Sequence, residues 1–117
     1  MLLGKLRLNG EREISALARQ TTHVFERMRG LLGRSTMGDC ECLWITRCNS
    51  IHTCFMRFAL DVVFVDKQGV VLKVCANVVP WRLCFCWSAA AVLEFCAGAA
   101  GQLGVSVGSH VEFLPNR

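Results

Sequence analysis

The sequence predicts a mainly β protein of the α+β class: a compact antiparallel β-barrel or sandwich of six to eight short strands, with one main helix near residues 22–33. Three observations carry this prediction. Short apolar runs recur along the chain, turn-forming residues separate them, and helical spacing is clear in one segment only. The chain has 117 residues, the length of one domain, so we expect residues 1–117 to form a single domain.

The first expected element is a hairpin. Leu2–Leu8 alternates loosely between apolar and polar residues, which is typical of a short strand. The dipeptide Asn9-Gly10 that follows is a strong turn signal. Ile14–Arg19 is therefore the expected partner strand.

The period then changes to that of a helix over Thr22–Leu32. Thr21 or Thr22 can cap its start, and Gly33 suits its C-terminal end. The apolar residues at helical spacing are Val24, Phe25, Met28, Leu31 and Leu32.

The remainder of the chain is expected to form short strands. Asp66–Gly69 has the composition of a hairpin turn. Trp81–Ser88 is expected to be a loop with two tryptophans, and Gly98–Gly104 to contain a short helical turn. The expected strands are Cys42–Arg47, Ser50–Phe58, Leu60–Asp66, Val70–Val79, Ala90–Ala97 and Val111–Leu114.

Composition excludes several classes of protein. Hydrophobic residues make up 53% of the chain and charged residues 19%, which excludes disorder. No apolar stretch is long enough for a membrane-spanning helix, and the start MLLGKLRLNGERE has no apolar signal core, so we expect a cytoplasmic protein.

The net charge is +4, but no dense basic stripe is visible, so nucleic acid is not the expected partner. Trp81, Phe85 and Trp87 around Arg82 could stack on a base, but such residues more often cover the end of a small barrel.

Eight cysteines raise the question of metal or redox chemistry. In a cytoplasmic chain we expect reduced thiols rather than disulfides. No Cys-x-x-Cys motif occurs, and the two Cys-x-Cys pairs, Cys40/Cys42 and Cys84/Cys86, miss the usual zinc spacing. The preferred interpretation is that cysteine packs as a small apolar residue, with no metal and no cofactor. A redox or metal protein remains an alternative.

Two carboxylates stand in strongly apolar surroundings. On a strand, Asp61 shares a face with Val63 and Val65, and the opposite face is apolar too. Glu94 lies in an equally apolar run. Because an unpaired buried carboxylate is costly, each acid must be paired, hydrogen-bonded or protonated. The candidate partners are Arg29, Arg57 and Arg82, or backbone N–H groups. The two acids could belong to one polar site, but for each acid taken alone we favour a structural role that locks a turn or a strand end.

A second polar group lies just before Asp61. Ser50, His52 and Thr53 occur close together within an otherwise apolar stretch. A histidine next to a cysteine could form a nucleophile–base pair, but residues two apart on a strand rarely have that geometry. Instead of catalysis we favour a core histidine whose ring nitrogens are satisfied by neighbours. Ligand contact is the other possibility, because His, Thr and Ser together are unusual in so apolar a run.

Several ordered blocks make the chain resemble a known family. They are Arg29–Arg34, Cys48–Asp66, Pro80–Arg82, Val92–Gly98 and Gly104–Gly108. Over about residues 14–114 the chain resembles the domain of unknown function 192 family, a group of small, mostly prokaryotic proteins. The resemblance implies a compact β-barrel or sandwich and brings no established activity. The positions that match its motifs are Arg29, Gly30, Ser50, His52, Thr53, Met56, Asp61, Asp66, Glu94, Gly98 and Gly108.

The functional prediction is a non-enzymatic binding or accessory domain, whose partner is an unidentified small molecule or protein. A few polar groups that converge in an apolar barrel are the usual form of a ligand site. The alternative is a hydrolase in which Asp61 or Glu94 acts as a base with His52. The predicted ligand-binding residues are His52, Thr53, Met56, Asp61, Glu94, Arg29 and Arg57.

Overall fold

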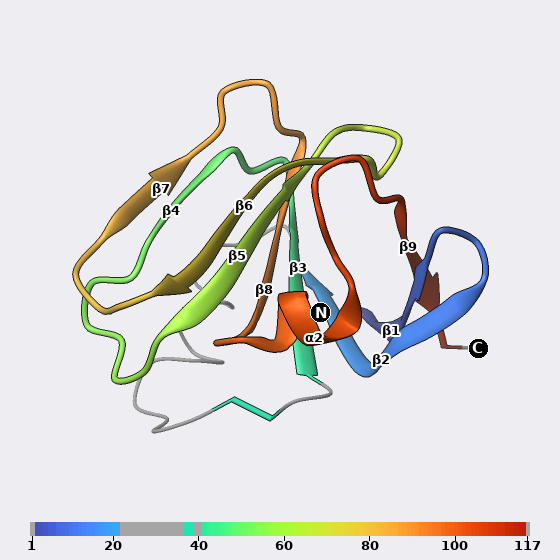
Figure 1. Cartoon of the computed structure of the whole chain (residues 1–117), viewed down its shortest axis with the longest axis horizontal. Helices are drawn as coiled ribbons and strands as arrows, with labels where there is room; N and C mark the ends of the chain where they lie inside the picture. Colours follow the sequence, from blue (N-terminus) through green and yellow to red (C-terminus); the bar gives the residue numbers. More distant parts are fainter. Residues whose placement is uncertain (1, 22–36, 39–40, 117) are drawn as a thin grey trace.

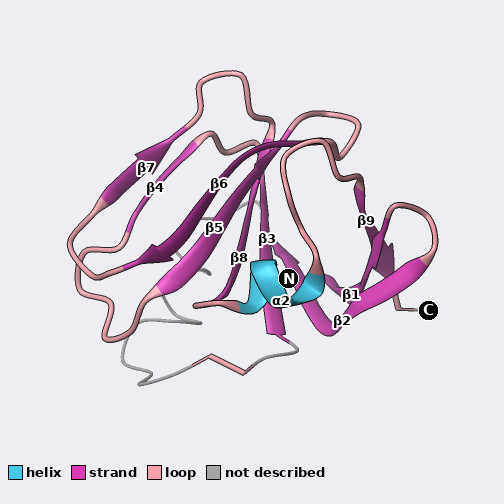
Figure 2. Cartoon of the chain, viewed as in Figure 1, coloured by secondary structure: helices cyan, strands magenta, loops and turns pink. Residues whose placement is uncertain are grey.

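A computed structural model describes residues 2–21, 37–38 and 41–116, and the predicted mainly β class is confirmed (Figures 1 and 2). The predicted helix near 22–33 lies outside the described residues. The predicted helical turn is the five-residue helix α2, Ala99–Leu103. The strands are β1 (Leu2–Leu8), β2 (Arg12–Thr21), β3 (Glu41–Thr46), β4 (Ser50–His52), β5 (Leu60–Val65), β6 (Val71–Val78), β7 (Leu83–Phe85), β8 (Ala91–Cys96) and β9 (Val111–Pro115).

Seven strands form one curled sheet in the order β6-β5-β8-β3-β2-β1-β9. All neighbours in it are antiparallel except β2 and β3, which pair in parallel. The other two strands, β4 and β7, form a separate two-stranded sheet (Figure 1). The described residues thus hold nine strands instead of six to eight. The additional strand is β7, which lies within the expected loop Trp81–Ser88.

Backbone hydrogen bonds draw the two edges of the large sheet together. Val71 N donates to Ser109 O at 2.8 Å, and Val111 N donates to Gly69 O at 2.9 Å. Gly69 has φ +85°, and a Cβ there would lie 2.3 Å from the carbonyl oxygen of Val111. Only glycine fits this close approach without displacing the backbone, so Gly69 permits the sheet to curl onto itself.

The sheet separates two apolar clusters, one on each face. The helix-side cluster includes Ala99 and Ala100 of α2 and the alternate β5 residues Val63 and Val65. The opposite cluster lies under the β4–β7 sheet, and its members are Met37, Leu43, Ile45, Ile51, Met56, Leu60, Val62, Phe64, Val78 and Val92. Every residue of β5 is buried because this strand has a cluster on both faces. No helix in the described part of the chain is long and apolar enough to cross a membrane.

Candidate functional site

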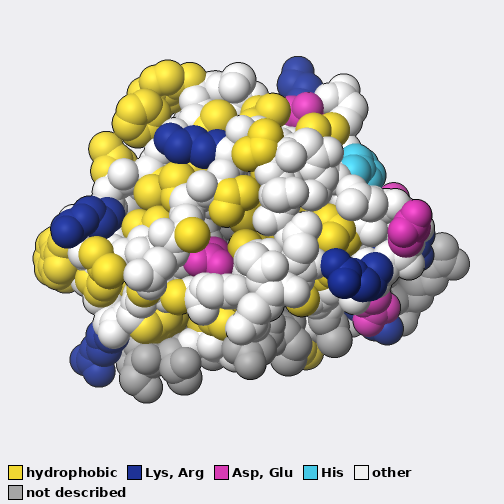
Figure 3. Space-filling view, in the orientation of Figure 1, with side chains coloured by type: hydrophobic (Ala, Val, Ile, Leu, Met, Phe, Trp, Pro, Cys, Tyr) yellow, Lys and Arg dark blue, Asp and Glu magenta, His cyan; other side chains and the backbone are white. Residues whose placement is uncertain are grey.

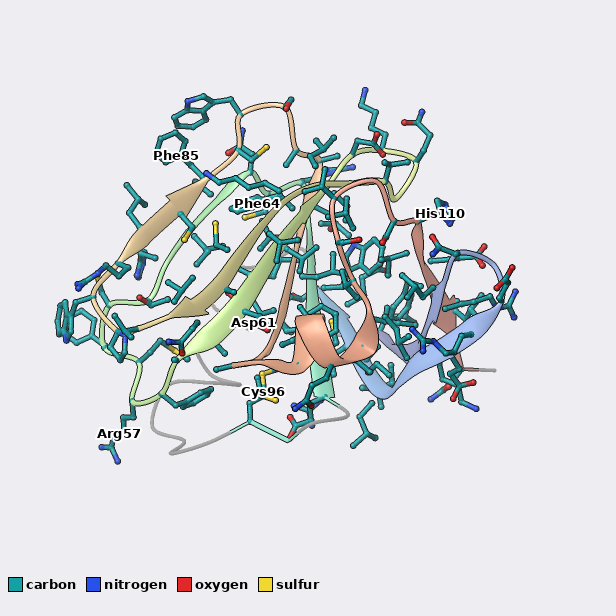
Figure 4. The ribbon with its side chains drawn as sticks, viewed as in Figure 1. Arg57, Asp61, Phe64, Phe85, Cys96 and His110 are labelled. Atoms are coloured by element: carbon teal, nitrogen blue, oxygen red, sulfur yellow. The ribbon has the colours of Figure 1, made fainter. Side chains whose placement is uncertain are left out.

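Asp61 is held by backbone amides. Its Oδ1 accepts a hydrogen bond from Asn77 N at 2.9 Å, and its Oδ2 accepts one from Ala100 N at 3.0 Å. The side chain is 1% exposed and lies between β5 and α2 (Figure 4). Asn77 has φ +52°, near the register shift between β5 and β6. Of the partners expected from the sequence, backbone N–H groups bind this acid, and the carboxylate ties β5 to β6 and to the start of α2.

Glu94 lies on the other face of the same sheet. It pairs with Leu43 on β3 and with Val62 on β5, and both of these residues belong to the cluster under β4–β7. Asp61 instead pairs with Phe95, which belongs to the helix-side cluster. Glu94 is 0% exposed.

The expectation that the two acids converge in one site is therefore wrong. Paired residues on neighbouring strands point to the same face, and successive residues on a strand alternate between faces. The register in which Asp61 faces Phe95 thus sends Asp61 and Glu94 to opposite sides of the sheet. A shift of one residue in this register would have brought them to the same side.

Thr53 joins two loops. Its hydroxyl donates to Val79 O at 2.7 Å and accepts a hydrogen bond from Arg82 N at 2.9 Å. Its backbone N–H donates to Arg82 O at 2.9 Å, and its carbonyl accepts from Met56 N at 3.2 Å. Thr53 is 0% exposed, and Met56 packs in the cluster under β4–β7. Together, these contacts explain why the expected strand Ser50–Phe58 ends at His52: the chain turns at Thr53.

The two remaining predicted site residues that the structure describes, His52 and Arg57, do not join the acids. His52 is exposed at the end of β4, and Arg57 is exposed and projects away from the body of the protein (Figure 4). Arg29 lies outside the described residues. Because both oxygens of Asp61 are bound to the backbone and His52 is exposed, this arrangement does not support the hydrolase alternative.

Sequence reasoning missed a surface cavity of about 640 Å³ at one end of the sheet. The connections β3–β4, β5–β6 and β7–β8 meet there. Cys48 N donates to Ala90 O at 3.3 Å, and Ala90 N donates to Val65 O at 2.8 Å, which fixes the three connections side by side. The residues that line the cavity are Arg47, Cys48, Asn49, Asp66, Lys67, Gln68, Ser88, Ala89 and Ala90.

We call this cavity, at the junction of the three connections, the loop cavity. Its charged side chains are not equally free to bind a ligand. Oδ1 of Asp66 accepts hydrogen bonds from Gln68 N at 2.9 Å and Val70 N at 3.0 Å, so this acid shapes the β5–β6 turn. Arg47 and Lys67 are exposed. The only sequence signal for the cavity was the predicted turn at residues 66–69, because its neighbours come from distant segments.

The cysteines differ in their surroundings. Burial, followed by the charge of Glu94, raises the pKa of Cys42 well above its ordinary value. Burial and the neighbouring Cys75 raise the pKa of Cys84 to about 11, against a smaller opposing effect of Lys73. Across residues 2–21, 37–38 and 41–116, no group of three His, Cys, Asp or Glu residues could hold a metal ion.

Comparisons with known proteins bear on the fold more than on the activity. A crystal structure from Sinorhizobium meliloti 1021, named as a candidate transcription regulator, is similar at 24% identity with a TM-score of 0.80, over 94% of this chain and 92% of that one. A protein of unknown function from Novosphingobium aromaticivorans DSM 12444 is similar at 25% identity with a TM-score of 0.76, over 92% of this chain and 83% of that one. No curated protein sequence matches the chain. The model of family DUF192, described as "Uncharacterized ACR", matches residues 6–113, nearly the whole chain. The chain therefore belongs to the domain of unknown function 192 family.

Proposed function

We propose that this protein is a non-enzymatic binding domain that takes a small anionic ligand in the loop cavity. The observation that carries the proposal is the cavity of about 640 Å³ at the junction of three connections. Ligand pockets typically measure about 300–1,000 Å³ and are found at the mouths of β-barrels. The cavity lies in a comparable position, at one end of the curled sheet.

Charge supports an anionic ligand. Arg47 and Lys67 line the cavity, and the one acid beside them, Asp66, already accepts two backbone hydrogen bonds. Asn49 and Gln68 add amide groups that can donate to a ligand oxygen. An oxyanion such as a phosphate or a carboxylate therefore fits this donor set better than a cation does.

The predicted ligand-binding residues then divide into two groups. We propose that Asp61 and Thr53 hold the scaffold, because their polar atoms are engaged with backbone groups. Ligand contact by His52, Met56, Glu94, Arg29 and Arg57 stays a prediction, as do the single-domain organisation and the cytoplasmic location.

The test is a binding screen with inorganic phosphate, sulfate and small carboxylates, read by two-dimensional NMR and thermal unfolding. We expect amide shifts at residues 47–49, 66–68 and 88–90 and a higher Tm with the bound anion. Arg47→Gln and Lys67→Gln should each weaken this response without lowering the Tm of the ligand-free protein. Lys5→Gln, a distant surface control, should leave binding unchanged. If no anion shifts these amides, or if Lys5→Gln weakens binding as strongly, the proposal is wrong.

A further inference from the structure

Exposed apolar side chains gather on one part of the molecule. We call residues 50–58 and 79–87, which contain β4 and β7, the β4–β7 lobe. The described residues include ten large apolar side chains that are exposed, and six of them belong to this lobe. They are Phe55 (66%), Val79 (39%), Trp81 (59%), Leu83 (68%), Phe85 (41%) and Trp87 (72%). A group of this size is uncommon on a monomeric protein and typically marks an interaction site.

The two-stranded sheet explains why these side chains face outward. Ile51 of β4 is buried and Cys84 of β7 is partly buried, and both contact the cluster beneath the lobe. Their strand neighbours Leu83 and Phe85 consequently project to the outer face. Because β4 and β7 pair only with one another, no other strand of the described chain continues this sheet.

The aromatic residues lie at the two ends of this sheet, in or next to the turns. Phe55 and Trp81 both have φ +67°, a backbone conformation that bulky residues rarely adopt. Their rings pair at 4.7 Å between centroids. At the other end, the rings of Phe85 and Trp87 lie 4.9 Å apart. The lobe thus presents two aromatic pairs with Leu83 between them.

The charge of the lobe is of one sign. It contains Arg57 and Arg82 and has no Asp or Glu. Lys73 of β6 reaches the same surface, because its Nζ donates to Phe85 O at 3.0 Å and lies 5.4 Å from the centre of the Phe85 ring. Figure 3 shows apolar and basic side chains together along this edge, with most of the visible acidic side chains elsewhere.

The ion pairs lie in the other part of the sheet. Within the described residues, the salt bridges join Lys5 to Glu13 and Arg7 to Glu112, on β1, β2 and β9. Neither involves the lobe. No acid of the described residues therefore forms a salt bridge with the arginines of the lobe.

We propose that the β4–β7 lobe binds the surface of a membrane that contains anionic lipid, with its aromatic and Leu83 side chains entering the headgroup region. Tryptophan beside arginine and lysine is the composition found at the boundary between bilayer and water. The basic residues supply the attraction to anionic headgroups, and the apolar residues supply buried area.

Two other partners fit the observations less well. Two copies that met through this lobe around a twofold axis would bring like arginines together with no acid to neutralise them. Single-stranded nucleic acid needs open, flat rings for base stacking. Here each ring already contacts a second ring, and the Phe55 and Trp81 planes are tilted by 59°.

The test is co-sedimentation of the full chain with vesicles of phosphatidylcholine alone or with about three parts in ten of phosphatidylserine. We expect binding to the anionic vesicles only, and weaker binding as salt is raised. Lipids brominated near the headgroup should quench the fluorescence of exposed Trp81 and Trp87. Trp44, which is 8% exposed, should be quenched far less, so Trp81→Phe with Trp87→Phe should abolish most of the quenching.

Variants separate the apolar and the electrostatic contributions. Leu83→Ser should weaken vesicle binding several-fold, whereas Val107→Ser, at a residue 66% exposed outside the lobe, should not. Arg57→Gln together with Arg82→Gln should lower the partition coefficient about 25-fold, at about fivefold for each charge. The matched control is Lys5→Gln together with Arg7→Gln. Circular dichroism verifies that each variant is folded.

Three results would overturn the proposal. The first is no binding to anionic vesicles at low salt. The second is an equal effect of the lobe variants and their controls. The third is tighter binding to a short oligouridylate than to vesicles, because the lobe would then be a nucleic-acid surface. None of these results bears on the loop cavity, whose amide shifts report the small-anion site separately.

Discussion

Replacing Asp61 with asparagine should destabilise the fold strongly, although the two side chains have nearly the same shape. Each carboxylate oxygen accepts a different backbone hydrogen bond, at 2.9 Å from Asn77 N and 3.0 Å from Ala100 N. Asparagine has one acceptor oxygen, so one of these amides would face an NH₂ group instead. A hydrogen bond to a charged group contributes about 1.5–3 kcal/mol, and a buried donor left without an acceptor costs about 1–3 kcal/mol.

We therefore expect Asp61→Asn to lower the free energy of unfolding by about 2–3 kcal/mol and Asp61→Ala by about 3–5 kcal/mol. At the size of this chain, the asparagine variant should lose about 10 °C in Tm. Asp66→Asn is a matched control. Both bonds to Asp66, from Gln68 N and Val70 N, end on the single oxygen Oδ1, so an asparagine carbonyl can keep both. That variant should lose less than about 1 kcal/mol.

Urea unfolding followed by tryptophan fluorescence measures these differences, and an unchanged m-value would indicate that only stability has changed. Amide hydrogen exchange adds a local measurement, since the amides of Asn77 and Ala100 should exchange faster in Asp61→Asn. If Asp61→Asn is as stable as Asp66→Asn, the carboxylate does not tie β5 to β6 and α2 as described. Asp61 would then be open again to a role in ligand binding.

Three further predictions concern the curled sheet and the thiols. Gly69→Ala should lower the free energy of unfolding in urea by about 2–4 kcal/mol, because its Cβ would lie 2.3 Å from Val111 O. The control is Gly10→Ala, which is also at positive φ but has open space around it and should cost about 1–2 kcal/mol. Equal effects of the two variants would refute the close approach at Gly69. Since the pKa of Cys84 is raised to about 11, its alkylation by iodoacetamide near pH 8 should be about 100-fold slower in the folded than in the unfolded chain, measured by mass spectrometry. Burial raises the pKa of Cys42, so the contribution of this thiol to stability is complete below the unfolded thiol pKa of about 8.5 and is lost as the pH rises above that value. The urea midpoint should therefore fall in alkaline solution, and it should fall less in Cys42→Ala.

Local patterns in the sequence were sufficient to find most strands. The alternation in Leu2–Leu8 and the Asn-Gly turn after it correspond to β1 and its connection to β2. The continuous apolar run over Leu60–Val65 corresponds to β5, buried on both faces. These predictions succeeded because the spacing of apolar residues reflects burial within one element.

The short elements could not be read in the same way. β4 and β7 have three residues each, and the pattern of Trp81–Ser88 was that of a loop. They are strands because Thr53 and Arg82, 29 positions apart, hold the two segments together. A contact between segments so far apart produces no periodic pattern of residues in the sequence.

The sequence alone determined that Asp61 and Glu94 are buried acids that need partners, because both lie in apolar runs whichever way the strands pair. It could not determine the partners, since these depend on how β5 and β8 align. The register that sets Asp61 opposite Phe95 sends the two acids to opposite faces, and packing brings Asp66 and Ser88 to one cavity. Apolar neighbours along the chain are enough to predict that a residue is buried, whereas a site is made by segments that meet only when the sheet closes.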